Sequence, residues 1–125
     1  MRVIGKRTSL WLAATAAMVL PLFLAGCGPS YSPSKPLSQL TPEEMQGHEI
    51  FVQECSSCHH ANHPGDLHGP SLFAMFRKKY LPSGAPANDD RVTYVIVNGR
   101  NMMPGFGNQL NQQQLQALLA YLHTL

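Results

Sequence analysis

The run Cys55-Ser56-Ser57-Cys58-His59 constrains this chain more than any other part of its sequence. A C-x-x-C-H run is typical of a covalent attachment site for a c-type haem. Two thiols at this spacing can form thioether bonds to the two vinyl groups of one porphyrin, and the next histidine is then held against the iron. A C-x-x-C pair alone also occurs in redox dithiols and zinc sites, but zinc needs a second ligand pair, which the sequence lacks. We therefore predict one covalent haem c on Cys55 and Cys58, with His59 as an iron ligand.

The first residues have the order of an export signal. Arg2, Lys6 and Arg7 precede an uncharged apolar stretch at residues 10–25, as in a secretory leader. A plain signal peptide and an uncleaved anchor helix are the alternatives to a lipoprotein leader. The apolar stretch is short for a spanning helix, and Pro21 interrupts it.

The leader ends in Leu24-Ala25-Gly26-Cys27, which resembles the lipobox of bacterial lipoproteins. In such proteins the chain is cut before the cysteine, and the new N-terminal cysteine carries lipid. We expect a lipoprotein signal peptide at residues 1–26, lipid on Cys27, and an extracytoplasmic protein anchored to a bacterial membrane. In a Gram-negative host this is the periplasmic side, and Gly28 in place of aspartate favours the outer membrane.

Charge and cysteine usage exclude other classes of protein. The chain has nine basic and seven acidic residues, but three of the basic residues lie in the leader, so the mature part is close to −1. A basic, nucleic-acid-binding protein is therefore not indicated. Arg77-Lys78-Lys79 is the one basic cluster, either a solvated helix end or a docking patch for a redox partner. Lipid on Cys27 and haem on the other two cysteines leave none for a disulfide.

The mature chain divides into a tether and a domain. Residues 27–40 contain the lipidated cysteine and a segment with three prolines and four serines. Thirteen residues of extended, proline-rich chain reach roughly 40 Å. The remaining residues, 41–125, form a domain so small that its own core is marginal. A buried, mostly apolar haem would supply the missing interior.

Two helices have clear start signals. Thr41 with Glu44 forms a capping box before a first helix. The helical spacing of His48, Phe51, Val52 and Cys55 predicts one face directed to the core. Asn111 with Gln114 begins the last helix in the same way, and a leucine stripe at Leu115, Leu118, Leu119 and Leu122 predicts that this helix packs.

Two segments between these helices are less clear. Residues 71–79 can form a short helix with Leu72, Met75 and Phe76 inward. Residues 91–97 contain β-branched side chains that favour a strand, whereas Asp89 or Asp90 could cap a helix that ends at Asn98-Gly99. Since no other segment offers a pairing strand, we predict a helix there and an all-α fold.

A second axial ligand is expected from the run Asn101-Met102-Met103-Pro104-Gly105. A methionine thioether is a soft neutral ligand, and a His/Met pair raises the reduction potential. Pro104 disfavours helix at the preceding residue and keeps the loop extended. Residue types alone leave Met102 and Met103 as candidates, or both as packing side chains.

Over residues 41–125 the chain resembles a small monohaem class I cytochrome c. The matching residues are Gly47, Phe51, the Cys55–His59 run, Gly69-Pro70-Ser71-Leu72, Asn98-Gly99, Met103-Pro104-Gly105-Phe106 and Tyr121 among Leu118–Leu122. The resemblance implies about four helices around one haem and selects Met103 as the sixth ligand. It also implies a Pro70 carbonyl near the proximal imidazole, and first and last helices that cross at Gly47, Phe51 and Tyr121.

The expected function is electron transfer by a membrane-tethered, monomeric protein that is not an enzyme. Iron held between His59 and Met103 has no free position for a substrate, and no other catalytic group is evident. The partners are redox proteins that the sequence does not identify. The alternative is a haem sensor or small peroxidase-like enzyme with a displaceable Met103. Five further histidines have no assigned role: His48, His60, His63, His68 and His123. None of them has a carboxylate or thiol partner at metal-ligand spacing.

Overall fold

This computed structural model describes residues 31–32 and 34–125 of the chain. Its elements are η1 (Leu37–Gln39), α1 (Pro42–Ile50), η2 (Phe51–Cys55), η3 (Met75–Arg77), α2 (Asp89–Asn98) and α3 (Gln112–Leu122). In these residues two isolated β-bridges occur but no strand, so the all-α prediction is confirmed. The predicted leader, Cys27 and residues 28–30 of the predicted tether lie outside the described residues. No helix in the described part is long and apolar enough to span a membrane.

Both predicted capping boxes are present. The Thr41 hydroxyl accepts a hydrogen bond from the Glu44 amide at 3.2 Å, while the Glu44 carboxylate accepts one from the Thr41 amide at 2.6 Å. Asn111 and Gln114 make the same reciprocal pair, each at 2.9 Å. These bonds satisfy amides that an α-helix leaves without partners in its first turn.

Helix α2 confirms the helical alternative for the β-branched segment. Its cap is Asn88, whose side chain accepts from the Arg91 amide at 3.0 Å, so the prediction of Asp89 or Asp90 as the cap was wrong. Both aspartates instead occupy the first turn, where they interact favourably with the helix dipole. The helix ends at Gly99, which has a positive φ of 75°.

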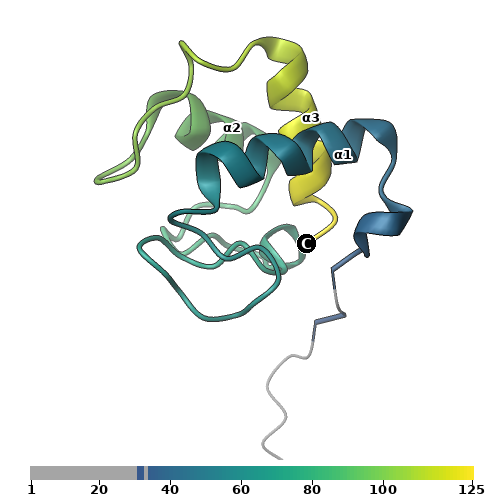
Figure 1. The fold of residues 1–125 in the computed structure, drawn as a ribbon. Helices are drawn as coiled ribbons and strands as arrows, with labels where there is room; N and C mark the ends of the chain where they lie inside the picture. The colour runs from purple at the N-terminus through teal and green to yellow at the C-terminus, as the bar shows by residue number, and fades with distance from the viewer. Residues whose placement is uncertain (1–30, 33) are drawn as a thin grey trace, which may run out of the picture. The chain divides into compact units, whose positions relative to one another are not determined.

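Helices α1 and α3 cross each other, as Figure 1 shows, and Gly47 lies at their contact. A Cβ atom at Gly47 would lie 1.9 Å from the Ala117 carbonyl oxygen and 2.8 Å from Tyr121 Cβ. Only glycine permits this approach. Tyr121 then packs against α1, with its ring 5.5 Å from that of Phe51 and 5.2 Å from that of His48. The crossing implied by the family resemblance is thus confirmed.

The end of the first helix differs from the prediction at Val52. The last turn is π-helical, and the Ser56 amide bonds to the Phe51 carbonyl at 2.9 Å. The wider turn leaves Phe51 buried and Cys55 half-buried but turns Val52 outward, 50% exposed. The expectation that Val52 shares the inward face was therefore wrong, because it assumed an unbroken α-helical period.

The segment at residues 71–79 forms only the 3-10 turn η3, and the helix predicted there was wrong. Ala74 precedes this turn in a left-handed conformation, with φ of 57°, and its side chain is fully buried. A left-handed residue cannot continue a right-handed helix. Met75 is nevertheless buried as predicted, whereas Leu72 and Phe76 are half-buried against the core.

The core is a single apolar cluster that joins the three α-helices to the loops between them. Its buried members are Ile50, Phe51, Met75, Val92, Ile96, Phe106, Leu115, Leu118, Tyr121, Leu122 and Leu125. Leu115, Leu118 and Leu122 belong to the predicted stripe, and Leu119 packs on the cluster from its edge. The leucine stripe therefore packs as predicted.

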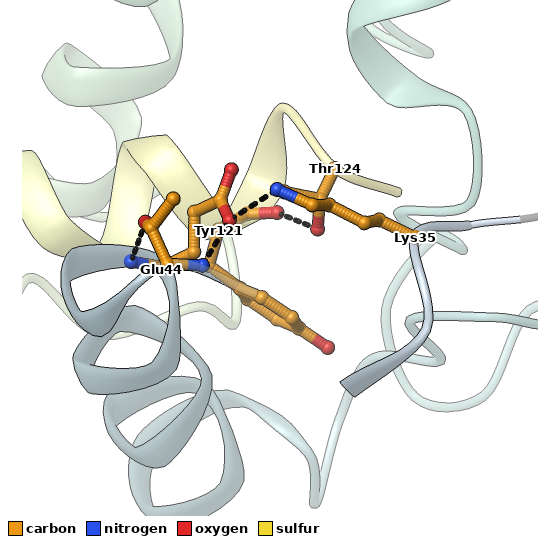
Figure 2. Close-up of polar contacts among 5 residues, drawn as sticks. Lys35, Glu44, Tyr121 and Thr124 are labelled. Carbon is orange, nitrogen blue, oxygen red and sulfur yellow. Dashed lines mark hydrogen bonds and ion pairs between the residues drawn. The ribbon is translucent and has the colours of Figure 1, made fainter. Parts of the chain in front are cut away.

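Residues 31–32 and 34–40 pack on the domain, with which they form one compact unit. Figure 2 shows Lys35, whose amide donates to the Thr124 carbonyl at 2.9 Å and whose ammonium lies 2.6 Å from the Glu44 carboxylate. Farther along, η1 leads to Leu40, which packs against the core. The compact unit begins at Tyr31.

Candidate functional site

A cavity of about 910 Å³ lies between the Cys55–His59 run, the loop of residues 66–72, α2 and the loop of residues 100–106. Ligand sites usually have volumes of about 300–1,000 Å³, so this cavity can take a large planar group. Apolar side chains from four segments form most of its wall, among them Leu72, Ile96, Phe106 and Leu118. Such a wall favours burial of an apolar ligand.

Both cysteines of the motif line this cavity. Cys55 is the last residue of η2, and Cys58 lies in the turn that follows, where the Cys58 amide and the His59 amide both bond to the Cys55 carbonyl, at 3.0 Å and 2.9 Å. Burial raises the pKa of the Cys55 thiol to about 11, and the nearby charges of Glu54 and Cys58 add to this effect. As free thiols, Cys55 is half-buried and Cys58 is exposed.

The imidazole of His59 is oriented by the loop that follows it. Its Nδ1 atom lies 2.7 Å from the Pro70 carbonyl oxygen. A carbonyl can only accept, so Nδ1 carries the proton and Nε2 keeps its lone pair for a metal. This contact places the Pro70 carbonyl where the family resemblance implied. A Cβ atom at Gly69 would lie 2.4 Å from His59 Cε1, so glycine leaves the space that the ring occupies.

Residues that sequence reasoning missed hold this loop in place. The Asp66 carboxylate accepts from the Ser71 amide at 2.8 Å, and the Ser71 hydroxyl donates to the His63 carbonyl. The Gly69 amide also donates to the Cys58 carbonyl at 2.8 Å. Aspartate in a loop rich in glycine and proline is a frequent acceptor for backbone amides, a signal that could have indicated Asp66.

The methionine loop closes the cavity from another side. The amide and carbonyl of Arg100 exchange hydrogen bonds of 3.0 Å and 2.9 Å with those of Met103, around a left-handed Asn101. Met103 is half-buried and packs against the core, whereas the Met102 side chain is 87% exposed. A Cβ atom at Gly99 would lie 2.5 Å from the Met103 carbonyl oxygen, so this glycine permits the tight return of the loop.

Four of the five histidines without an assigned role have structural contacts. His48 packs on Tyr121, the His60 ring packs edge-on against that of His63 at 5.3 Å, and His63 Nδ1 accepts from the Gly65 amide at 3.0 Å. His123 Nε2 lies 2.7 Å from the Asp89 carboxylate, and its ring stacks on Phe76 at 3.8 Å. Across residues 31–32 and 34–125, no cluster of three or more His, Cys, Asp or Glu side chains could hold a metal ion.

The donor set of the cavity fits a c-type haem. Two thiols stand where thioethers could form, and one imidazole nitrogen has a free lone pair. Met102 and Met103 both line the same apolar cavity. A haem would also fill the volume that the protein side chains leave.

Comparison with known proteins identifies the family. The profile of the family described as cytochrome c oxidase, cbb3-type, subunit III matches residues 42–122, and the chain belongs to this family. It is 28% identical over 79 residues to cytochrome c6 of Picosynechococcus sp., an alignment that covers 61% of this chain and 68% of that protein. It is 36% identical over 89 residues to the cbb3-type cytochrome c oxidase subunit FixP of Azorhizobium caulinodans, which covers 68% of this chain but 28% of FixP.

The fold, the cavity and the family together define a small monohaem class I cytochrome c. It is an electron-transfer haem protein with one covalently bound haem c.

Proposed function

We propose that this protein is an exported, membrane-tethered carrier that passes single electrons between redox proteins. Cys55 and Cys58 would hold the haem through thioethers, and His59 and Met103 would ligate its iron. Lipid on Cys27 anchors the protein on the extracytoplasmic side of a bacterial membrane. The observation that carries the proposal is the position of His59 and Met103 on one cavity, with His59 Nδ1 bonded to the Pro70 carbonyl.

When bound, the haem supplies a one-electron Fe(III)/Fe(II) couple. The protein's part is to orient its ligands and to exclude water. The Pro70 carbonyl fixes the tautomer of His59 and increases the basicity of its Nε2 atom. The return of the loop through Gly99 holds the half-buried Met103 at the cavity. A soft thioether favours the reduced metal, and an apolar wall reduces solvent access.

The test is a pair of variants in the haem-loaded protein. Met103→Ala removes the proposed sixth ligand, so the sulfur-to-iron charge-transfer band should vanish, the reduction potential should fall, and the protein should bind carbon monoxide. Met102→Leu alters an exposed side chain of similar size and should leave the spectrum and the potential nearly unchanged. Absorption spectroscopy and a redox titration measure both effects.

Three results would contradict parts of the proposal. The opposite behaviour of the two variants would assign Met102 as the ligand. Unchanged spectra in both would place the ligand elsewhere. Rapid binding of carbon monoxide by the wild-type protein would show an open iron site, as expected of a sensor or a peroxidase-like enzyme.

A further inference from the structure

Tyr31 and Ser32, the first residues that the structure describes, lie beside Arg77 of the basic cluster Arg77-Lys78-Lys79. The Arg77 guanidinium donates to the Ser32 carbonyl at 2.7 Å, and its central carbon lies 5.8 Å from the centre of the Tyr31 ring. It also lies 5.6 Å from the centre of the Phe73 ring. Arg77 therefore holds Tyr31 and Ser32 against the domain next to the basic cluster.

The packing of residues 31–40 shortens the tether. Lys35 bonds to Thr124 and to Glu44, and Leu40 packs on the core. Residues held in this way add nothing to the length of the tether. From Cys27 to Tyr31 the chain has four Cα–Cα steps, which reach at most roughly 14 Å. The full segment of residues 28–40, if extended, would instead reach roughly 40 Å.

The basic cluster has the charge that an anionic surface would attract. Arg77 and Lys79 are exposed and Lys78 is half-buried. In residues 31–32 and 34–125, none of the three takes part in an ion pair. Tyr80 follows them, 53% exposed and with its ring 5.3 Å from the Lys79 ammonium. Tyrosine beside lysine is a combination that suits the headgroup region of a bilayer.

We propose that Arg77, Lys78 and Lys79 form a membrane-facing patch that binds anionic lipid headgroups and orients the tethered domain. This inference rests on the proposed lipid anchor at Cys27. The short tether brings the patch close to the bilayer, where each basic residue contributes favourably within a Debye length of the surface. Because Lys78 and Tyr80 also line the cavity, this orientation brings the haem side of the domain towards the lipid.

The experiment uses the lipidated, haem-loaded protein in vesicles that carry a fluorescent headgroup, which the haem quenches at short range. Quenching should be stronger in vesicles with phosphatidylglycerol than in pure phosphatidylcholine at 0.01 M salt. The difference should disappear at 1 M salt, where the Debye length falls from about 30 Å to about 3 Å. In Lys78→Gln/Lys79→Gln the oriented population should fall about fivefold for each lysine removed.

Two matched variants control for charge and position. Lys78→Arg/Lys79→Arg retains the charge and should quench like the wild-type protein. Arg91→Gln removes an exposed charge from α2 and should also leave the quenching unchanged. Equal losses in Arg91→Gln and Lys79→Gln would overturn the assignment to this patch.

The remaining outcomes separate this inference from the anchor. Mass spectrometry of Cys27 reads the anchor directly, and an unmodified cysteine would overturn both proposals. Acylated protein with equal quenching in the two vesicle types would overturn the membrane-facing patch alone. Unchanged quenching in Lys78→Gln/Lys79→Gln, with slower electron exchange to a protein partner, would reassign the cluster as a protein docking surface.

Discussion

At the scale of single residues, the site depends on close contacts that the His59 ring makes with the loop of residues 66–72. The Pro70 carbonyl determines which nitrogen of His59 is free, and Gly69 leaves room for the ring. A hydrogen bond to a metal-ligating histidine fixes the tautomer and the orientation of its ring and increases its basicity. Two predictions follow at this scale, for the attachment thiols and for Gly69.

Cys55→Ala and Cys58→Ala should each weaken covalent haem retention, and the double variant should abolish it, because each change removes one thioether. Haem staining after denaturing electrophoresis measures this retention. Ser57→Ala lies between the two positions and is the control that should stain normally. Undiminished staining of the double variant would refute the assignment of the two thiols.

Gly69→Ala should perturb the proximal ligand without loss of haem. The new methyl group would lie 2.4 Å from His59 Cε1, so the ring must move and its bond to the Pro70 carbonyl should weaken. A less basic imidazole stabilises ferric iron less, and the reduction potential should rise. A redox titration checks this, and Gln116→Ala, at an exposed position of α3, is the control. An unchanged potential in Gly69→Ala would argue against His59 as the ligand.

At the scale of secondary-structure elements, the crossing of α1 with α3 holds the domain together. It depends on Gly47, over which the backbone of α3 passes, and on the packing of Tyr121 against Phe51. Burial raises the pKa of Tyr121, as expected for a phenol that packs inside this crossing. The π-helical turn η2 then extends α1 to the attachment cysteines.

Gly47→Ala should destabilise the domain by about 3 kcal/mol, the upper end for an overpacked site, because the clash is with backbone rather than with a mobile side chain. Chemical denaturation monitored by circular dichroism measures the free energy of unfolding. The neighbouring Gln46→Ala, at an exposed position of α1, should change it by less than about 0.5 kcal/mol. Similar stabilities for the two variants would show that the helices do not cross at this residue.

At the scale of the whole molecule, residues near the start and the end of the described chain stabilise each other. Lys35 joins the Thr124 carbonyl after α3 to the Glu44 carboxylate in the first turn of α1 (Figure 2). The Lys35 ammonium, followed by the Thr41 amide, lowers the pKa of Glu44 from 4.5. A lowered folded-state pKa gives stability that is present above the unfolded-state pKa and is lost as the pH falls through the folded-state value.

Glu44→Gln should therefore reduce the free energy of unfolding at neutral pH by a few tenths of a kcal/mol to about 1 kcal/mol, since the ion pair is partly screened by solvent. The glutamine side chain can still accept from the Thr41 amide, so the variant isolates the charge. The difference from wild type should shrink as the pH falls below 4.5, the unperturbed pKa of this carboxyl group. Unfolding curves between pH 3 and pH 7 test this, and a constant difference would exclude the ion pair as its cause.

Features of this protein that depend on neighbours in the chain could be predicted from the sequence. The C-x-x-C-H run predicted the haem chemistry because thioether attachment requires a short, defined spacing. The capping boxes at Thr41 and Asn111 were predicted because a helix start is satisfied by side chains within three residues. Local signals did not decide the helical character of α2, because its β-branched residues favoured a strand and its cap signals favoured a helix. The absence of another segment that could pair as a strand decided the prediction.

Features that depend on distant contacts appeared only in the tertiary structure. Residue types left Met102 and Met103 open; in the fold both line the cavity, but the Met102 side chain is exposed and Met103 packs on the core. The left-handed Ala74 interrupted a helix that its neighbours favoured, since burial of its methyl group in the core outweighs local preference. Residues 31–40 have the composition of a free tether, yet they pack on the domain through Lys35 and Arg77. Composition describes what a segment can do alone, whereas the side-chain partners of Lys35 and Arg77 lie 9 and 45 residues away and come together only in the folded chain.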